Sequence, residues 1–230
     1  MIRLIVHVTL PDNTTLLCGE MVSTSPDPRG RMHGAFRYVP EYLKHPEAFP
    51  LDPAILPLTS KEFQTERPEG VHAVFEDALP DDWGRALLIK KAKLGRGEQT
   101  IPRMLEALGD GGLGALSFQS KQKRSAPDCS ADIKDLETIL NAAMRYESGL
   151  PLDEEELQLL YQSGSSPGGA RPKALCRKED GSLWIAKFPR HQDTFHVESI
   201  EAATLELAKG SGLPVPEFEI RNLGKKRHSL

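Results

Sequence analysis

The sequence predicts an α+β fold, in which a small antiparallel sheet with helices precedes a second domain built around a hairpin. Three observations indicate this class. Apolar and polar residues alternate over residues 2–10, the period of a strand with one buried face. Apolar residues recur at helical spacing between Trp83 and Met144. Two strand-like runs joined by a turn lie in residues 173–189, and a helical stripe follows them.

Composition narrows the classes of function. The 230 residues suffice for one or two domains. A chain that binds nucleic acid by itself usually carries a clear basic excess, whereas this one has a net charge of −4, so direct nucleic-acid binding is not expected. Three distant cysteines without a C-x-x-C pair, and histidines without metal spacing, signal neither a metal site nor a disulfide framework. No run of about 18 apolar residues is present, so we expect a cytoplasmic protein without a membrane span.

The first half of the chain alternates strands, turns and short helices. Turn residues at 11–13 separate the first strand from a returning strand, TLLCGEMV. Residues 36–58 contain five prolines, which forbid a long helix and favour a strand followed by an extended segment. Two helices and a strand are then expected: Trp83 to about Leu94, capped by Asp81 or Asp82 and ended by Gly95; Thr100 through Leu108; and a strand over 114–119.

Polar residues 119–131 predict a linker, which places the domains at 1–125 and 126–230. A helical stripe from Ile133 to Met144 follows it. The remaining expected elements are a helix over 153–162, a hairpin turning at Glu179–Gly181, a helix, and a strand with a basic tail at 225–228. The last helix carries Val197, Ile200, Thr204, Leu207 and Ala208 on one face.

Two glycine-containing segments match the spacing of phosphate loops without the required context. Gly164 and Gly169 have Walker spacing, but Ala170 and Arg171 stand where Lys and Ser or Thr are needed, and a strand follows instead of a helix. Residues 109–114 match G-x-G-x-x-G, but there a helix comes before and a strand after, the reverse of a dinucleotide site. We interpret that segment as a structural turn.

A third kind of phosphate loop fits better. In protein kinases a glycine-rich loop covers the ATP phosphates, a lysine on a following strand contacts them, and a glutamate on the next helix pairs with that lysine. Gly168 and Gly169, then Lys187 in W-I-A-K-F, offer these parts in order. Three glutamates lie on the next helix, at 198, 201 and 206, and Glu201 is favoured because it borders the apolar face. The alternative is an exposed lysine and a solvated glutamate.

These residues resemble a known family. SSPGGARPKA, WIAKFP and VESIEAATLELAKGSGLPVPE are similar to the HipA family of bacterial serine/threonine kinase toxins of type II toxin–antitoxin systems. FRYVPEYLKHPEAFPLDPAILPL, VFEDALPDDWGRALL and ALGDGGLGALSF resemble that family's N-terminal subdomain, in the same order. The resemblance covers nearly all of the chain. It implies a HipA-like N-terminal subdomain over 1–125, followed by a protein-kinase-like N-lobe over 126–230.

The resemblance also implies roles for single residues. ATP would be bound by Ser165, Ser166, Gly168, Gly169, Ala170, Lys173 and Lys187. Glu201 would pair with Lys187, and Ser166 matches an autophosphorylation site best, with Ser165 as the alternative. The implied cofactors are ATP and Mg²⁺. The implied partners are a HipB-like helix-turn-helix antitoxin and a protein substrate such as an aminoacyl-tRNA synthetase.

The chain departs from the family in one respect. Kinase catalysis needs an aspartate beside the substrate hydroxyl, an asparagine, and a second aspartate for Mg²⁺, all beyond the helix of Glu201. The 29 residues after Glu201 contain no aspartate. The sequence thus predicts a truncated N-lobe, without catalytic or Mg²⁺-binding residues, that transfers no phosphate alone. The alternative is a non-catalytic binding module or decayed kinase fragment that binds an antitoxin or a partner chain.

Overall fold

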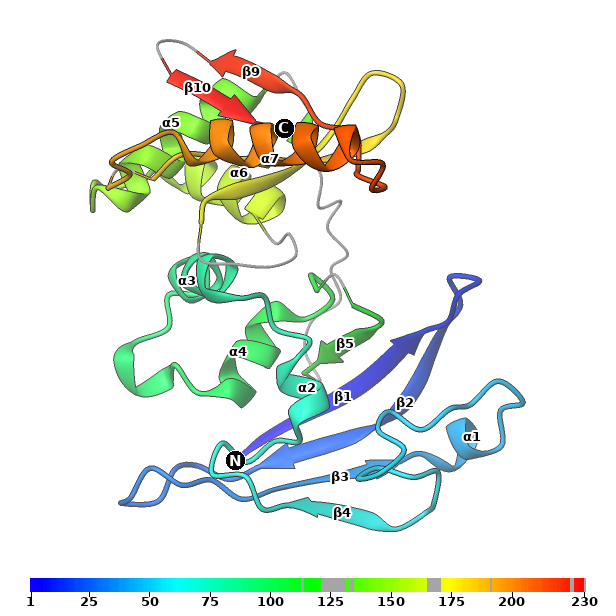
Figure 1. Cartoon of the computed structure of the whole chain (residues 1–230). Coiled ribbons are helices and arrows are strands. Elements are labelled where there is room, and N and C mark those ends of the chain that lie inside the picture. The colour runs from blue at the N-terminus through cyan, green and yellow to red at the C-terminus, as the bar shows by residue number, and fades with distance from the viewer. Residues whose placement is uncertain are drawn as a thin grey trace. The chain divides into compact units, whose positions relative to one another are not determined.

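The structure is a computed structural model that describes residues 1–112, 114–120, 131–132, 135–164, 171–190, 192–223 and 226–229. The chain divides into two compact units. Unit 1 comprises Met1–Pro80 and Leu88–Pro127, and unit 2 comprises Asp81–Leu87 and Asp128–Leu230. Each unit combines one mixed or antiparallel sheet with helices (Figure 1), so the predicted α+β class is confirmed. Most of the predicted linker, residues 121–130, lies outside the described residues.

Unit 1 is built on a five-stranded antiparallel sheet with the strand order β4-β3-β2-β1-β5. A β-bulge between Val6 and His7 interrupts the register of β1 with β2. The strands are β1 (Ile2–Thr9), β2 (Thr15–Ser23), β3 (Gly34–Tyr38), β4 (Glu62–Thr65) and β5 (Leu116–Gln119).

The alternation predicted for the first strand is confirmed, since Leu4, Val6 and Val8 are fully buried on one face of the sheet. Helix α4 packs on β1 and β5, and α2 packs on α4. Aromatic rings add to this core, with Phe36 in edge contact with Tyr38 at 4.9 Å between ring centroids. The helices wholly within unit 1 are α1 (Pro40–Leu43), α2 (Ala73–Glu76), the 3-10 helix η1 (Arg96–Glu98) and α4 (Ile101–Leu108).

Several elements of unit 1 differ from the sequence predictions. The short elements α1, α2 and β4 were not predicted, because four residues carry too little periodicity. Helix α3 (Asp82–Lys91), which joins the two units, ends before Leu94, and Lys93 adopts the left-handed conformation expected of Gly95. Residues 109–112 form the predicted turn between α4 and β5, in which Gly109 has φ 62°.

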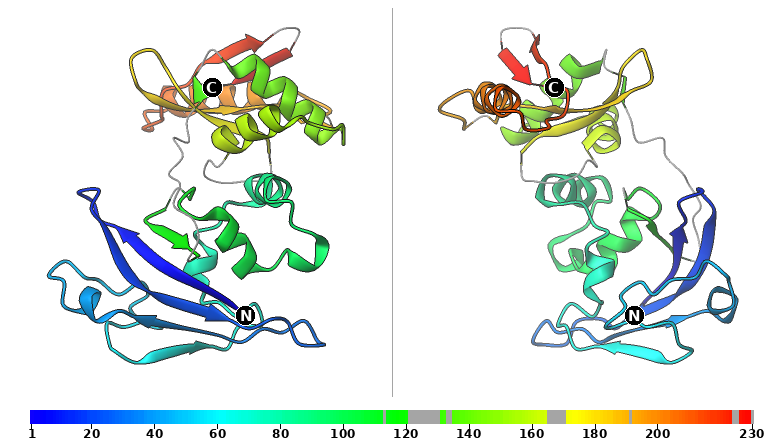
Figure 2. Two further views of the ribbon diagram at one scale, coloured as in Figure 1. Left: turned by 180° about the vertical axis from the view of Figure 1, so that it is seen from behind. Right: turned by 45° about the vertical axis from the view of Figure 1, so that its right-hand side comes forward.

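Unit 2 contains a second five-stranded sheet with the order β6-β7-β8-β10-β9, in which β6 runs parallel to β7 and the other pairs are antiparallel. Helix α6 packs on β6 and β7 and also on α5, whereas α7 lies on the opposite side against β9 and β10 (Figures 1 and 2). The elements are β6 (Ala131–Asp132), α5 (Leu136–Glu147), α6 (Glu154–Gly164), β7 (Lys173–Arg177), β8 (Leu183–Lys187), α7 (Val197–Gly210), β9 (Ile220–Leu223) and β10 (Lys226–Ser229).

The predicted hairpin is confirmed as β7 and β8. The Gly181 N–H donates to the Lys178 carbonyl at 2.9 Å, and Gly181 has φ 84°, which only glycine adopts at little cost. The predicted basic tail is wrong, because residues 226–229 form β10, which pairs with β9 along its length.

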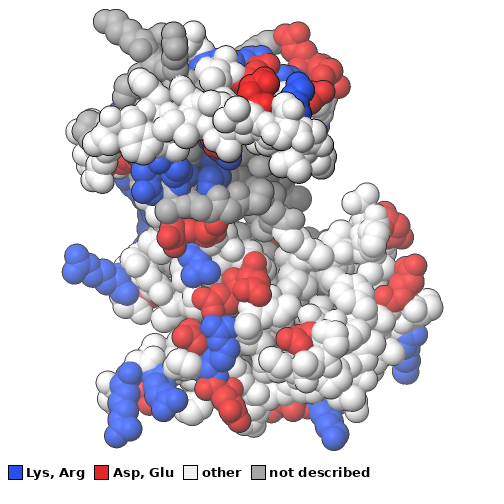
Figure 3. Space-filling model, viewed as in Figure 1, with Lys and Arg blue, Asp and Glu red and all other residues white. Residues whose placement is uncertain are grey.

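The apolar stripe that the sequence indicates on α7 is not its buried face. Ile200 and Leu207, which belong to this stripe, are 55% and 73% exposed. Glu198 and Ala202 are buried instead. The surface over α7 accordingly shows few charged side chains (Figure 3). Among the described residues, no helix is long and apolar enough to cross a membrane.

Replacing Gly34 by alanine should destabilise unit 1. A Cβ at Gly34 would stand 1.9 Å from the carbonyl oxygen of Gly70, which is backbone and cannot rotate away. Overpacking of this kind costs roughly 1–3 kcal/mol, occasionally more. Gly97→Ala is the matched control, since its Cβ would meet no atom within 4 Å. Urea denaturation of both variants measures the difference; equal stability of the two would contradict the close approach of β3 to Gly70.

Unit 1 should become less stable as the pH is lowered, in part because of His72. The imidazole is buried and lies 3.1 Å from the Phe63 carbonyl oxygen. Burial lowers its pKa below the ordinary value of 6.5, so protons bind the unfolded chain preferentially below that pH. The contribution of His72 is therefore complete above about pH 6.5 and lost as the pH falls through the folded-state pKa. His72→Gln, which keeps an N–H donor but does not titrate, should lose less stability between about pH 7 and pH 5. Parallel stability curves for both proteins would disprove this.

Candidate functional site

The two faces of the β7–β8 hairpin differ in how deeply their side chains are buried. On one face Ala174, Cys176 and Ala186 are buried almost completely. On the other face Lys173 stands directly opposite Lys187 in the strand register. Leu183, on the same face as Lys187, is 55% exposed, so this face is partly open. The open face is where a ligand can reach Lys187, whose side chain is 44% exposed, whereas Lys173 is buried.

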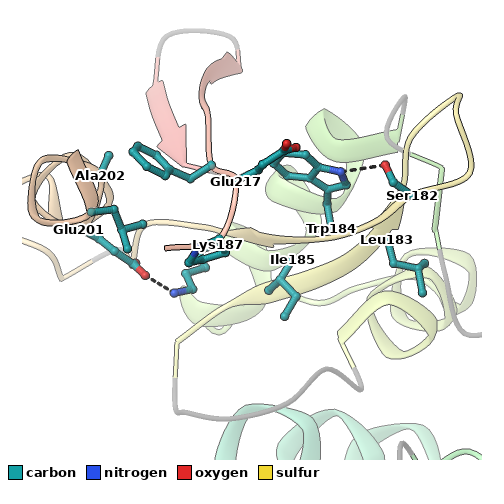
Figure 4. A pocket seen from close by; sticks show the side chains of 11 residues that line it. Ser182, Leu183, Trp184, Ile185, Lys187, Glu201, Ala202 and Glu217 are labelled. Carbon is teal, nitrogen blue, oxygen red and sulfur yellow. Dashed lines mark hydrogen bonds and ion pairs between the residues drawn. The ribbon is translucent and has the colours of Figure 1, made fainter. Parts of the chain in front are cut away.

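Lys187 forms an ion pair with Glu201 of α7 (Figure 4). Their side chains are 44% and 38% exposed. The other two glutamates considered from the sequence do not take this place: Glu198 contacts Arg171, and Glu206 is exposed at the surface. The structure thus brings together β8 and α7 through the lysine and glutamate that sequence analysis had paired.

Lys173 lies in a less common environment for an amine. It is 6% exposed, and this burial is the main reason that its pKa lies below the ordinary value of 10.5. The positive charges of Lys187 and Arg190 lower the pKa further, whereas Asp81 raises it. An anion bound on this face would reduce the repulsion among the three cations, so the electrostatics favour a negatively charged ligand.

A pocket of about 480 Å³ adjoins the Lys187–Glu201 pair (Figure 4). Its size falls within the range of small-molecule sites. In the described part of the sheet, β10 pairs with β8 only where Ser229 faces Lys187, which leaves the rest of the β8 edge open beside the segment before β9. The principal lining residues are Leu183, Trp184, Ile185, Lys187, Glu201 and Phe218.

Trp184 is held as a wall of this pocket by polar contacts. Its indole Nε1 donates to Ser182 Oγ at 2.9 Å, and that hydroxyl donates to Asp180 Oδ1 at 2.6 Å. The ammonium of Lys178 stands 3.3 Å from the centroid of the Trp184 ring and also contacts Glu219. A cation over the ring restrains it further, so the aromatic wall is preorganised.

Sequence analysis missed Trp184, Phe218 and Arg171 as site residues. The strand pattern placed Trp184 on the face opposite Lys187, and it could not show that the edge of β8 is open, where the pocket reaches both residues. The remaining expected residues of the glycine-rich loop, Ser165, Ser166, Gly168, Gly169 and Ala170, lie outside the described residues. In the described ranges no group of three or more His, Cys, Asp or Glu side chains is placed to hold a metal ion.

Two family profiles match the chain. The HipA N-terminal domain profile matches residues 19–119, and the HipA-like C-terminal domain profile matches residues 165–230. The chain therefore belongs to the HipA family. Comparison with curated proteins found no significant match.

Among solved structures, the fold is similar to HipA of Shewanella oneidensis MR-1, determined in a toxin–antitoxin complex with HipB and operator DNA. The TM-score is 0.54 at 21% sequence identity. The match covers 98% of this chain and 49% of that protein, so the chain spans about half the length of the HipA that it matches.

Glu201→Gln should leave the stability of the chain almost unchanged. The Lys187–Glu201 pair is more than one third exposed on both sides, and exposed ion pairs stabilise proteins by about 0–1 kcal/mol. The free energy of unfolding, measured in urea, should change within that range. A loss of several kcal/mol would show that the pair is a structural support and not a ligand-binding device.

Proposed function

We propose that this chain supplies the nucleotide-binding part of a HipA-like serine/threonine kinase of a toxin–antitoxin system. The observation that carries the proposal is the Lys187–Glu201 pair beside an open pocket, with a second lysine facing Lys187 across the hairpin. In protein kinases a strand lysine paired with a helix glutamate holds the ATP phosphates. The family membership points to the same chemistry.

Under this proposal the pocket at the edge of β8 receives ATP. Lys187 would contact phosphate oxygens, and the buried Lys173 opposite it would add positive charge. The apolar part of the pocket, with Trp184 and Phe218, would receive the base. The glycine-rich residues 165–170, with Gly168 and Gly169, would bind the phosphates through backbone N–H groups, as the family membership implies. Ser166, or alternatively Ser165, would be the autophosphorylated residue. The described residues show no fit to a Mg²⁺ site, so the role proposed for this chain is to bind and orient the nucleotide.

The partner proposed for this chain is a HipB-like helix-turn-helix antitoxin. The support is the fold shared with the Shewanella HipA, which was solved together with HipB and operator DNA. A protein substrate such as an aminoacyl-tRNA synthetase belongs to the same proposal by family membership alone. The second candidate is a binding module without catalysis, and its support is that the Shewanella HipA was solved in a complex with HipB and operator DNA.

Titration with a non-hydrolysable ATP analogue tests the nucleotide function. Lys187→Met should weaken binding at least about 10-fold, because a hydrogen bond to a charged group contributes about 1.5–3 kcal/mol. Lys209→Met removes an exposed lysine from the last turn of α7 and should leave the affinity unchanged.

Two other results would count against the nucleotide site. Equal effects of the two substitutions would mean that the analogue responds to overall charge. If the unmodified chain ignores the analogue but binds a HipB-like protein in size-exclusion chromatography, the binding-module candidate replaces the kinase proposal for this chain.

A further inference from the structure

Arg171 joins three segments around the candidate site. It is the first described residue after the glycine-rich segment 165–170. Its Nη1 donates to Asp193 Oδ1 at 3.1 Å, and its Nη2 also donates to Asp193 Oδ2. The same Nη2 donates to Glu198 Oε1 at 3.1 Å. One guanidinium therefore ties the start of the hairpin to the connection after β8 and to the first turn of α7.

The two carboxylates that accept hydrogen bonds from Arg171 are shielded from water. The Glu198 side chain is 3% exposed, and its second oxygen has no hydrogen-bond partner within the described residues. The Asp193 side chain is 14% exposed. Burial opposes ionisation of Asp193, but the hydrogen bonds from Arg171 and from the Arg190 N–H hold its pKa below the ordinary value. A buried carboxylate needs its cation, so the first turn of α7 depends on Arg171.

The position of Glu201 follows from that of Glu198. Residues three apart on a helix lie on the same face, so holding Glu198 also fixes the direction in which Glu201 points. The Lys187–Glu201 pair is too exposed to orient a helix by itself. The better shielded contacts of Arg171 are therefore the ones that fix α7 relative to β8.

We propose that Arg171 is a positioning residue, which holds α7 so that Glu201 meets Lys187 before any ligand binds. The use of the Lys187–Glu201 pair in orienting phosphates rests on the proposed nucleotide function. The positioning of the pair by Arg171 does not. The chain therefore presents a preassembled lysine–glutamate pair, and the end of the glycine-rich segment and the pair are connected through one guanidinium.

The test measures how fast a water-soluble acylating reagent modifies Lys187 in the folded chain, with peptide mass spectrometry as the readout. Arg171→Met should raise the rate at Lys187 by roughly 2- to 5-fold, the change in population that an exposed ion pair controls. The rate at Lys209, on the far end of the same helix, should stay unchanged. Arg177→Met is the matched control, because Arg177 is an exposed arginine at the end of β7 that donates to the Gly181 carbonyl. It should alter neither rate.

Arg171→Met leaves the buried Glu198 without its cation, and the variant can fail to fold. The double variant Arg171→Met/Glu198→Gln removes that charge as well, and circular dichroism establishes whether α7 is retained. A combination with Glu201→Gln then separates positioning from general support. If Arg171 acts through Glu201, adding Arg171→Met to Glu201→Gln gives no further increase at Lys187. Two results would overturn the proposal. One is that the increases at Lys187 caused by Arg171→Met and by Glu201→Gln multiply when the two are combined. The other is that the rate at Lys187 is unchanged in the folded Arg171→Met/Glu198→Gln variant.

The labelling experiment needs no nucleotide, so it separates this inference from the proposed function. A chain that ignores the ATP analogue but shows the Lys187 response keeps the positioning role of Arg171 and loses the nucleotide function. A chain that binds the analogue but shows no Lys187 response keeps the nucleotide function, and Arg171 then has no positioning role.

Discussion

Two lysines, Lys173 and Lys187, face one another across the β7–β8 hairpin, and their positive charges repel each other. The arrangement of unit 2 around them depends on acidic side chains that offset this repulsion. Like charges directly opposite in an antiparallel pair are destabilising. Glu201 from α7 pairs with Lys187, and Asp81 raises the pKa that burial lowers in Lys173. Each acidic partner comes from a different element, so the charge balance of the hairpin can exist only when those elements are in place. The same balance leaves an open face on which an anion is favoured.

The sequence was sufficient for the parts of this site that depend on local periodicity. The alternation of β8 placed Ile185 and Lys187 on one side, and helical spacing put three glutamates within reach, of which Glu201 forms the pair. The hairpin turn followed from Gly181, whose conformation is local. These features need only the period of one element, and the structure has them as the sequence indicates.

The features that the sequence did not reveal depend on contacts between distant residues. The contacts of Arg171 join residues separated by 22 and 27 positions, and no local pattern connects them. The outward stripe of α7 is the clearest case. Helical periodicity identified an apolar face correctly but could not show that a paired, buried Glu198 takes the inner face instead. In unit 1, the elements of four residues were not predicted for a different reason. Each is about as long as one helical turn, which is too short to show a periodic pattern.

The exposed stripe of α7 has a practical consequence for work with the isolated polypeptide. Ile200 and Leu207 stand in water with most of their surface accessible. Exposed apolar side chains are places where hydrophobic dyes and other apolar surfaces can bind. The colloidal behaviour of the chain will therefore depend on protein concentration and on the salt used, because excluded salts strengthen apolar contacts. Dye-based melting curves will start from a high baseline signal that belongs to the native surface and not to unfolding.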